Sequence, residues 1–158
     1  MTDQQKEFMQ EAIRLSQQGM DRNEGGPFGC VIVKSNIIVG RGNNKVTSTN
    51  DATAHAEVNA IRDACKNLNT HDLTGCEVYA SCEPCPMCLS AIYWARMKKI
   101  YFACSRKDAA TIGFDDDFMY NEIPKEYDQR MIPIEQCMHD EAFIVFEKWI
   151  VKPDKMNY

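Results

Sequence analysis

Residues 81–88, SCEPCPMC, place three cysteines and two prolines within eight positions. So dense a group of thiols restricts the segment to one of two arrangements, a metal site or a disulfide knot. The prolines at 84 and 86 limit the backbone on either side of Cys85, which favours a fixed turn before a helix. A turn restricted in this way also loses less entropy when its cysteines bind a ligand.

The cellular compartment of the protein indicates whether these cysteines bind metal or form disulfides. The N-terminal segment MTDQQKEFMQEAIRL has no apolar signal region, so we expect a cytoplasmic protein. Reducing compartments disfavour structural disulfides, so the eight cysteines are expected as thiols, and their clustering indicates metal. No stretch approaches the roughly 20 apolar residues of a membrane span, which predicts that the membrane is not a partner.

Length and charge narrow the fold and the partners further. A chain of 158 residues is typical of one domain, so we expect a single domain over residues 1–158. The net charge of −5 argues against a nucleic-acid partner, because phosphates attract basic surfaces.

The chain alternates helix-like and strand-like segments. An amphipathic helix is expected to begin at an Asp3 cap and to end near Gly19, and two β-branched runs around residues 34–36 predict an antiparallel hairpin. The alternation that follows predicts an α/β sandwich with parallel crossovers. In chain order the later segments are a helix at 54–68, strands at 76–81 and 98–104 with a helix at 87–97 between them, a last strand at 130–136 and a terminal helix at 140–151.

Three residues have the chemistry and spacing of a catalytic zinc site. Cys85 and Cys88 form a C-x-x-C pair at the first turn of an expected helix, and His55 begins another. A catalytic zinc takes three protein ligands and keeps its fourth position for water. Helix starts also stabilise thiolates, the form in which cysteine binds metal. Cys82 lies nearby, but a fourth thiolate would close the site, so we expect it to pack beside the ligands.

Glu57 indicates what such a site would do. It follows His55 by two positions, and at a first helical turn both side chains can reach an ion near the helix axis. Glu57 can then take a proton from water and pass it to a leaving group. The strings HAE at 55–57 and PCPMC at 84–88 together match the H-x-E and P-C-x-x-C signature of zinc nucleobase deaminases.

The sequence resembles the cytidine-deaminase-like superfamily, and within it the small bacterial guanine deaminases. The segments that carry the resemblance span nearly the whole chain: GGPFGCVIV, NNKVTSTNDATAHAEVNAIR, YASCEPCPMCLSAIYWAR and GFDDDF. Ala52 and Met97 stand where the family often has proline. The resemblance implies a three-layer α/β/α sandwich around a mixed five-stranded sheet.

The resemblance also implies roles for individual residues. It places one zinc ion per subunit on His55, Cys85 and Cys88 and gives proton transfer to Glu57, with Asp116 binding the 2-amino group and protonating the departing ammonia. The residues that it places against the substrate are Phe28, Asn44, Ala56, Trp94 and Tyr158. It further implies a homodimer in which the C-terminal helix and tail, about 140–158, are exchanged, so that Tyr158 covers the partner's pocket.

Ordinary structural roles are alternatives for several of these residues. Asn44 is suited to capping the end of the hairpin, and Phe28 and Trp94 to core packing. Asp116 belongs to an acidic run that would otherwise be a solvated loop, and a terminal tyrosine such as Tyr158 would fray. His71 and His139 are expected to be solvated. The remaining cysteines are expected to be buried and inert: Cys30, Cys65, Cys76, Cys104 and Cys137.

The function predicted from all of this is hydrolysis of guanine, a small purine base, to xanthine and ammonia. Guanosine, cytosine or adenosine in transfer RNA are alternative substrates of the same chemistry. A structural zinc module for protein contacts is an alternative of another class, and it would need a fourth protein ligand and no Glu57.

Overall fold

The computed structural model describes residues 1–156, and the chain forms two compact units, Met1–Asp117 (unit 1) and Phe118–Tyr158 (unit 2). Each unit is described by itself. The single domain expected over residues 1–158 stays a prediction.

Unit 1 is built on a mixed sheet. Its strands are β1 (Gly29–Lys34), β2 (Ile37–Asn43), β3 (Glu77–Cys82) and β4 (Lys99–Cys104), in the spatial order β2-β1-β3-β4. β1 is antiparallel to β2 and β3, whereas β3 and β4 are parallel. The expected α/β class is confirmed.

The expected fifth strand is wrong. Residues 1–156 contain four strands, and residues 130–136 form bends and irregular backbone instead. Pro133 lies in the middle of this segment and has no N–H to donate to a neighbouring strand. The apolar run MIPI that suggested a strand is therefore interrupted where a sheet would need continuous pairing.

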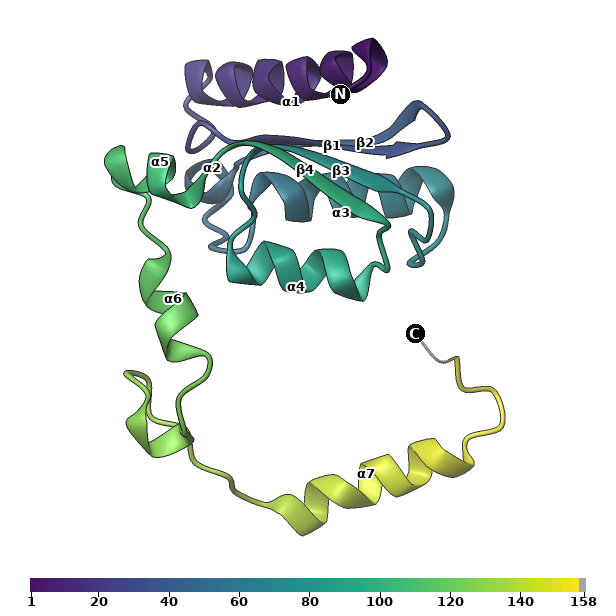
Figure 1. The fold of residues 1–158 in the computed structure, drawn as a ribbon. Helices are drawn as coiled ribbons and strands as arrows, with labels where there is room; N and C mark the ends of the chain where they lie inside the picture. The colour runs from purple at the N-terminus through teal and green to yellow at the C-terminus, as the bar shows by residue number, and fades with distance from the viewer. Residues whose placement is uncertain (157–158) are drawn as a thin grey trace. The chain divides into compact units, whose positions relative to one another are not determined.

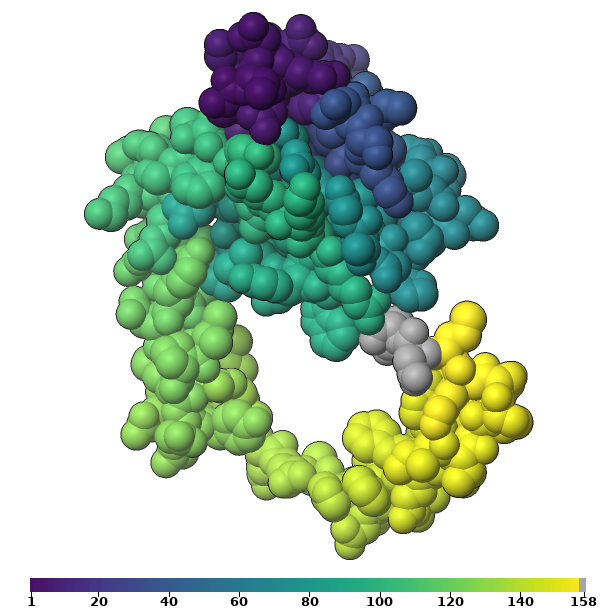
Figure 2. Space-filling view, turned by 45° about the vertical axis from the view of Figure 1, so that its right-hand side comes forward, coloured from purple at the N-terminus to yellow at the C-terminus, as the bar shows by residue number. Residues whose placement is uncertain are grey.

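Helices cover both faces of the sheet, so the expected three layers are present (Figure 1). α1 (Asp3–Asp21) packs on one face, and α3 (Ala56–Leu68) and α4 (Pro86–Trp94) lie on the other. The space-filling view shows α1, in purple, lying directly against the rest of unit 1 (Figure 2). Two short helices, α2 (Val46–Thr49) and α5 (Arg106–Thr111), lie in the connections.

The ends of α1 differ from the expectation. Thr2, not Asp3, is the N-cap: its hydroxyl accepts from the Gln5 N–H while the Gln5 side chain accepts from the Thr2 N–H. The helix also continues through Gly19 to Asp21. A Cβ at Gly19 would lie 2.3 Å from the Asn43 side chain, so this glycine permits close packing on β2 rather than ending the helix.

The hairpin turn and two glycines fix how β2 approaches α3. Ser35 and Asn36 both have positive φ, 49° and 62°, as a two-residue turn between right-twisted strands requires. On β2, a Cβ at Gly40 would lie 2.4 Å from the Ala60 carbonyl oxygen, and one at Gly42 would lie 2.2 Å from that of Ala56. α3 therefore rests directly on the strand, which holds its first residues in place.

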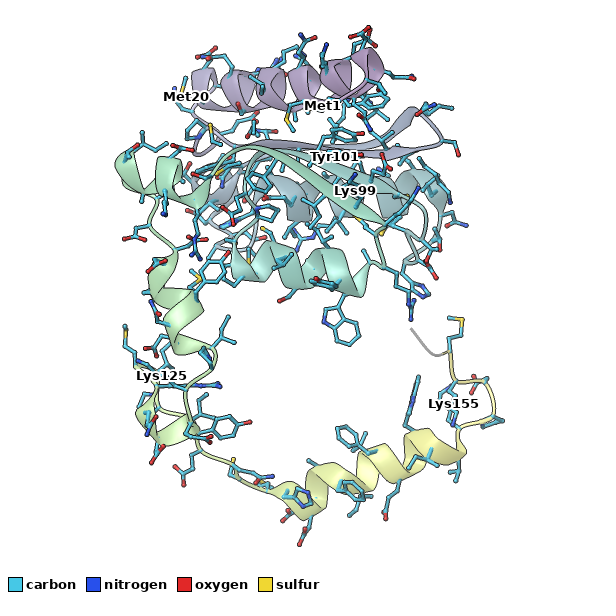
Figure 3. All side chains as sticks on the ribbon, viewed as in Figure 1. Met1, Met20, Lys99, Tyr101, Lys125 and Lys155 are labelled. Atoms are coloured by element: carbon cyan, nitrogen blue, oxygen red, sulfur yellow. The ribbon has the colours of Figure 1, made fainter. Side chains whose placement is uncertain are left out.

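Two apolar clusters hold the layers together. One fills the space between the sheet and the helices α3 and α4, and the other joins the sheet to α1. In the second, Tyr101 stacks on buried Tyr79 with ring centroids 4.6 Å apart, and its hydroxyl accepts from the Gln5 side chain at 2.9 Å. Figure 3 shows Tyr101 and Lys99 on β4, where the Lys99 ammonium lies 4.6 Å from the centre of that ring.

Unit 2 has short elements and exposed apolar side chains. They are α6 (Asp117–Glu122), which begins at the last residue of unit 1, a 3-10 turn at Tyr127–Gln129 and α7 (His139–Val151), which confirms the expected terminal helix. Over its described residues, α7 buries no side chain. No helix within residues 1–156 has both the length and the apolar character needed to cross a membrane.

Candidate metal and catalytic site

Two helix starts bring the candidate ligands together. His55 is the N-cap residue of α3 and Cys85 that of α4, and both have extended backbone with ψ of 158° and 168°. Neither side chain makes a capping hydrogen bond, so both are free to point toward a shared site. Pro86 occupies the first turn of α4, where a missing N–H costs nothing, and Cys88 follows in that same turn.

The donor atoms have the spacing of a zinc site. His55 Nδ1 lies 3.6 Å from Cys85 Sγ and 3.5 Å from Cys88 Sγ, and the three donors all lie within 4.8 Å of one another. Zn–N bonds of about 2.0–2.1 Å and Zn–S bonds of about 2.3 Å in a tetrahedron separate nitrogen from sulfur by roughly 3.6 Å. One imidazole and two thiols therefore fit zinc, with one position left over.

The three ligands share protons in a way that a cation can replace. Hydrogen bonds from Cys88 and His55 lower the pKa of Cys85 to about 4, despite its partial burial. The bond to Cys85, together with burial, raises the pKa of Cys88, and the bond to Cys85 also raises that of His55. These pKa shifts favour a thiolate at Cys85 that accepts hydrogen bonds from Cys88 and His55. Metal binding requires those protons to leave, since zinc ligates thiolate and neutral imidazole.

Glu57 lies in the first turn of α3 and is buried, with 7% of its surface exposed. Burial raises the pKa of its carboxyl group, and the side chain also interacts with the Cys88 thiol. An acid enclosed beside the ligands, with a pKa raised by burial, is suited to accept and release a proton during a reaction.

Asn44 is buried, and its side-chain oxygen accepts hydrogen bonds from the backbone. Its Oδ1 accepts from the N–H groups of Gly26 at 3.3 Å and Val46 at 3.2 Å. Both lone pairs of this oxygen are therefore occupied, and the expected capping role is confirmed. Nδ2 is then the side-chain group of Asn44 that can donate to a substrate, and the substrate contact expected of Asn44 stays a prediction.

Phe28 packs against the core and against a residue that the sequence reasoning missed. Its ring meets that of Phe114 edge to face, with centroids 4.9 Å apart and planes at 89°. Phe114 is 45% exposed, so part of its ring is open to solvent beside Phe28. The signal was available in GFDDDF, where Phe114 precedes the acidic run by one residue.

Asp116 lies near the ligands in the structure. Partial burial raises the pKa of its carboxyl group, and the negative Cys85 sulfur adds to this effect. The Asp116 charge in turn contributes to the raised pKa of His55. Of the acidic run at 115–117, Asp116 is the partly buried member, so the run is not uniformly a solvated loop.

The other expected substrate residues have different positions. Ala56 is buried between His55 and Glu57 at the start of α3. Trp94 ends α4, nine residues and roughly 13 Å of helix beyond Cys85. It is 70% exposed and lines an open surface pocket with Ser90, Tyr93 and Arg96, so the core packing considered for it is wrong. Tyr158 lies outside the described residues.

The cysteines outside the ligand set are of two kinds. Cys82 is buried, with its sulfur 3.7 Å from the Ser105 carbonyl oxygen, as expected for a residue that packs beside the site. Cys30 and Cys76 are buried and Cys65 is partly buried, whereas Cys104 and Cys137 are exposed, so the expectation of burial is wrong for these two. His71 and His139 are exposed as expected.

Comparison with known proteins extends these observations. Residues 2–104 match the family model of the cytidine and deoxycytidylate deaminase zinc-binding region. Over 151 residues the chain is 49% identical to guanine deaminase of Bacillus subtilis (strain 168), covering 96% of this chain and 97% of the relative. A solved structure of guanine deaminase from Bacillus subtilis has a TM-score of 0.95 and 47% identity, covering 100% of this chain and 99% of that chain.

A second kind of relative matches a shorter part of the sequence. The chain is 40% identical over 125 residues to a tRNA-specific adenosine deaminase of Aquifex aeolicus (strain VF5), covering 76% of this chain and 82% of the relative. The two kinds of relative therefore differ in how much of this chain they match, 96% for the guanine deaminase and 76% for the tRNA-specific adenosine deaminase.

Proposed function

The chain belongs to the cytidine and deoxycytidylate deaminase zinc-binding family, and we propose that it hydrolyses guanine to xanthine and ammonia. Similarity to a guanine deaminase along 96% of the chain supports this substrate. The observation that carries the chemistry is the placement of His55, Cys85 and Cys88 around one point, with buried Glu57 beside them.

His55, Cys85 and Cys88 would hold one zinc ion per subunit. When bound, zinc supplies the Lewis acidity that makes water a nucleophile at neutral pH. The protein's own contribution is to present one nitrogen and two sulfurs from two fixed helix starts. The site then needs little rearrangement to bind the ion.

Glu57 moves the protons of the reaction in this proposal. Its carboxylate takes a proton from the attacking water and delivers it to the ring nitrogen next to C2 of guanine. Burial keeps bulk water away from the carboxyl group, so the proton passes between the reacting atoms rather than to solvent. The raised pKa of Glu57 fits a group that must both gain and lose a proton.

Recognition of guanine is assigned to residues around this centre. Asp116 accepts hydrogen bonds from the 2-amino group, then takes the proton of the new hydroxyl group on C2 and delivers it to the amino group, which leaves as ammonia while C2 becomes a carbonyl. Its raised pKa suits this transfer. Asn44 donates from Nδ2 to an acceptor on the purine, since its oxygen is already bonded. Phe28 stacks on the base, and Ala56 contacts it from the start of α3.

We extend the proposal to a homodimer in the cytoplasm. The apolar side chains of α7, including Phe146 at 65% and Ile150 at 63% exposure, are what a helix carries when it packs on another subunit. Exchange of the segment at about 140–158 would bury them and bring Tyr158 over the partner's pocket. An aromatic lid there would exclude water and the ribose of nucleosides. Exposed Trp94 is proposed to contact substrate only in such an assembly.

Two other functions are less well supported. An adenosine deaminase acting on transfer RNA needs a surface that attracts phosphates, and the net charge of −5 opposes this. A structural zinc module needs a fourth protein ligand, whereas the described residues offer a group of three, with a buried acid alongside.

The proposal is tested by offering purified protein guanine, guanosine, adenine, cytosine and cytidine in turn and measuring ammonia release. Guanine should be the preferred substrate. Glu57→Gln should lower its turnover by on the order of 10³-fold, because general acid–base transfer is lost while the ligands remain. Metal analysis of the same variant is the control, and it should still contain zinc. Absence of ammonia release from guanine by the wild-type protein would reject the assignment.

A further inference from the structure

Glu83 joins the loop that carries the zinc ligands to the segment that follows β4. It lies two residues before Cys85, and its N–H donates to the Cys104 carbonyl oxygen at 2.8 Å. Its carboxylate accepts a hydrogen bond from the N–H of Arg106 at 3.0 Å. Arg106 is the first residue of α5. Glu83 therefore holds the chain on both sides of Ser105.

α5 depends on such bonds because it has little apolar packing of its own. It is six residues long, and Ala109 is its one buried side chain among the described residues. A capping box between Ser105 and Asp108 stabilises its first turn from within. The bond from Glu83 is different in kind, since it connects that turn to the metal loop.

The other end of α5 is closed by two backbone hydrogen bonds and leads directly to the proposed recognition residues. Gly113 has a φ of +91°. The N–H of Gly113 donates to the carbonyl oxygen of Ala110, and the N–H of Phe114 donates to the carbonyl oxygen of Ala109, each at 3.1 Å. These two bonds form the Schellman ending of a helix. The direction of α5 thus fixes where Phe114 leaves it.

Beyond this ending, the chain returns to the site. Phe114 meets the ring of Phe28, and Asp116 lies near the Cys85 sulfur. The Arg106 side chain pairs with Asp117 at 3.8 Å, so the two ends of the segment are also joined to each other. A tilt at the first turn of α5 would therefore move Phe114 and Asp116 relative to the zinc ligands.

We propose that Glu83 is a positioning residue that holds α5 against the zinc loop and so sets the place of Phe114 and Asp116 over the bound base. The proposal rests on the proposed function, in which Asp116 binds guanine. Glu83 acts here as a hydrogen-bond acceptor, so its charge is not required. Glutamine can make the same bond, whereas alanine cannot.

Three variants separate this role from a general loss of stability. Glu83→Ala removes the link, Glu83→Gln keeps it, and Ser105→Ala weakens the first turn of α5 without touching the link. Each is measured for zinc content, Tm, and kcat and KM with guanine. We expect Glu83→Ala to retain zinc and to raise KM roughly 10-fold, the effect of losing one hydrogen bond that positions substrate contacts. Glu83→Gln and Ser105→Ala should leave KM within about threefold of wild type.

A double-mutant cycle tests whether Glu83 acts through Asp116. In an Asp116→Ala background, Glu83→Ala should change kcat/KM by less than about threefold, because the substrate hydrogen bond that it positions is already gone. Independent, multiplying effects would overturn the proposal, as would an unchanged KM in Glu83→Ala.

Hydrogen–deuterium exchange gives a readout that does not depend on guanine. Amides of residues 106–117 should exchange faster in zinc-loaded Glu83→Ala than in wild type, and at the wild-type rate in Glu83→Gln. Unchanged exchange in Glu83→Ala would overturn the positioning role whatever the substrate is. If exchange is faster in Glu83→Ala as expected, but the wild-type protein does not turn over guanine, the substrate assignment is rejected and the positioning role is not.

Discussion

Units 1 and 2 both carry many large apolar side chains, but they differ in what covers them. In unit 1 these side chains form two clusters, one on each face of the sheet. From Ile123 onward the described apolar residues of unit 2 are exposed, with Ile132 at 76% and Val151 at 78%. Apolar side chains gathered on an exposed segment are typical of a surface that packs against a partner. Unit 1 therefore holds its site with its own core, whereas unit 2 leaves most of its apolar side chains uncovered.

This difference parallels the division between chemistry and substrate choice. The family match at residues 2–104 lies within unit 1 and includes the zinc ligands and Glu57. The similarity to guanine deaminase continues through nearly the whole chain. Unit 1 thus carries what the family shares, and we expect the residues after 104 to contribute what is particular to guanine.

The largest expected effect is on the metal site of unit 1. Cys88→Ala removes a fully buried ligand and should abolish zinc binding and turnover of guanine. It should also lower Tm, because zinc stabilises a folded state by about 4 kcal/mol when its free concentration is a thousand times Kd. Metal analysis, calorimetry and ammonia release measure these changes. Cys104→Ala, at an exposed thiol, is the control and should change none of them.

A second effect should appear in association rather than in the chemistry. Phe146→Asp places a charge on the apolar surface of α7 and should weaken self-association by about 2–4 kcal/mol, roughly 30- to 1000-fold. Sedimentation velocity over a range of concentrations measures the change. Glu147→Gln on the same helix is the matched control. An unchanged sedimentation profile for Phe146→Asp would show that α7 is not buried between subunits.

A third effect should fall on the core of unit 1 and spare unit 2. Gly42→Ala forces a Cβ to within 2.2 Å of the Ala56 carbonyl and should lower the free energy of unfolding by about 1–3 kcal/mol. Urea denaturation measures the loss. Gly75→Ala separates crowding from backbone strain, because Gly75 has a φ of +83° but no atom within 4 Å of the added Cβ. Equal losses in the two variants would contradict the close packing of α3 on β2.

The smallest expected effect is a pH dependence of the free energy of unfolding, which arises from Glu11 on the surface of unit 1. Hydrogen bonds from Arg14 and then Arg41 lower the pKa of Glu11 below its ordinary value of 4.5. A lowered pKa in the folded state means that the stabilisation is present above pH 4.5 and is lost as pH falls through the folded value. Because the arginines are half exposed, we expect less than about 1 kcal/mol.

Glu11→Gln tests this pH dependence. Urea titrations of the variant and the wild type should differ at pH 6 and converge as the pH falls through the lowered pKa of Glu11, while Glu7→Gln at an exposed position of the same helix should not show this pattern. A difference that grows as the pH falls would contradict the assignment.

The grouping of His55, Cys85 and Cys88 was predictable because its signals are local. HAE and PCPMC each lie at a helix start, and helix starts can be read from capping residues and prolines. The hairpin was predictable for a similar reason, since its polar turn is short. Asp116 could be singled out only through the resemblance, because nothing within an acidic run says which carboxylate turns toward the site.

The features that could not be predicted involve partners that are distant in the sequence. The oxygen of Asn44 is occupied by Gly26, which is 18 residues away, and the importance of Glu83 appears only when Arg106 is placed beside it. Exposure of Trp94 and Cys104 likewise depends on which neighbours cover them. The fifth strand is the exception, since Pro133 is visible in the sequence and marks the point at which strand pairing would be interrupted.

The central claim is that one imidazole and two thiolates hold a catalytic zinc with an open position. X-ray absorption at the zinc edge of the active protein tests this directly. The account predicts two sulfur neighbours at about 2.3 Å and two lighter neighbours at about 2.0–2.1 Å. Three or four sulfur neighbours, or protein that turns over guanine at full rate without zinc, would contradict it.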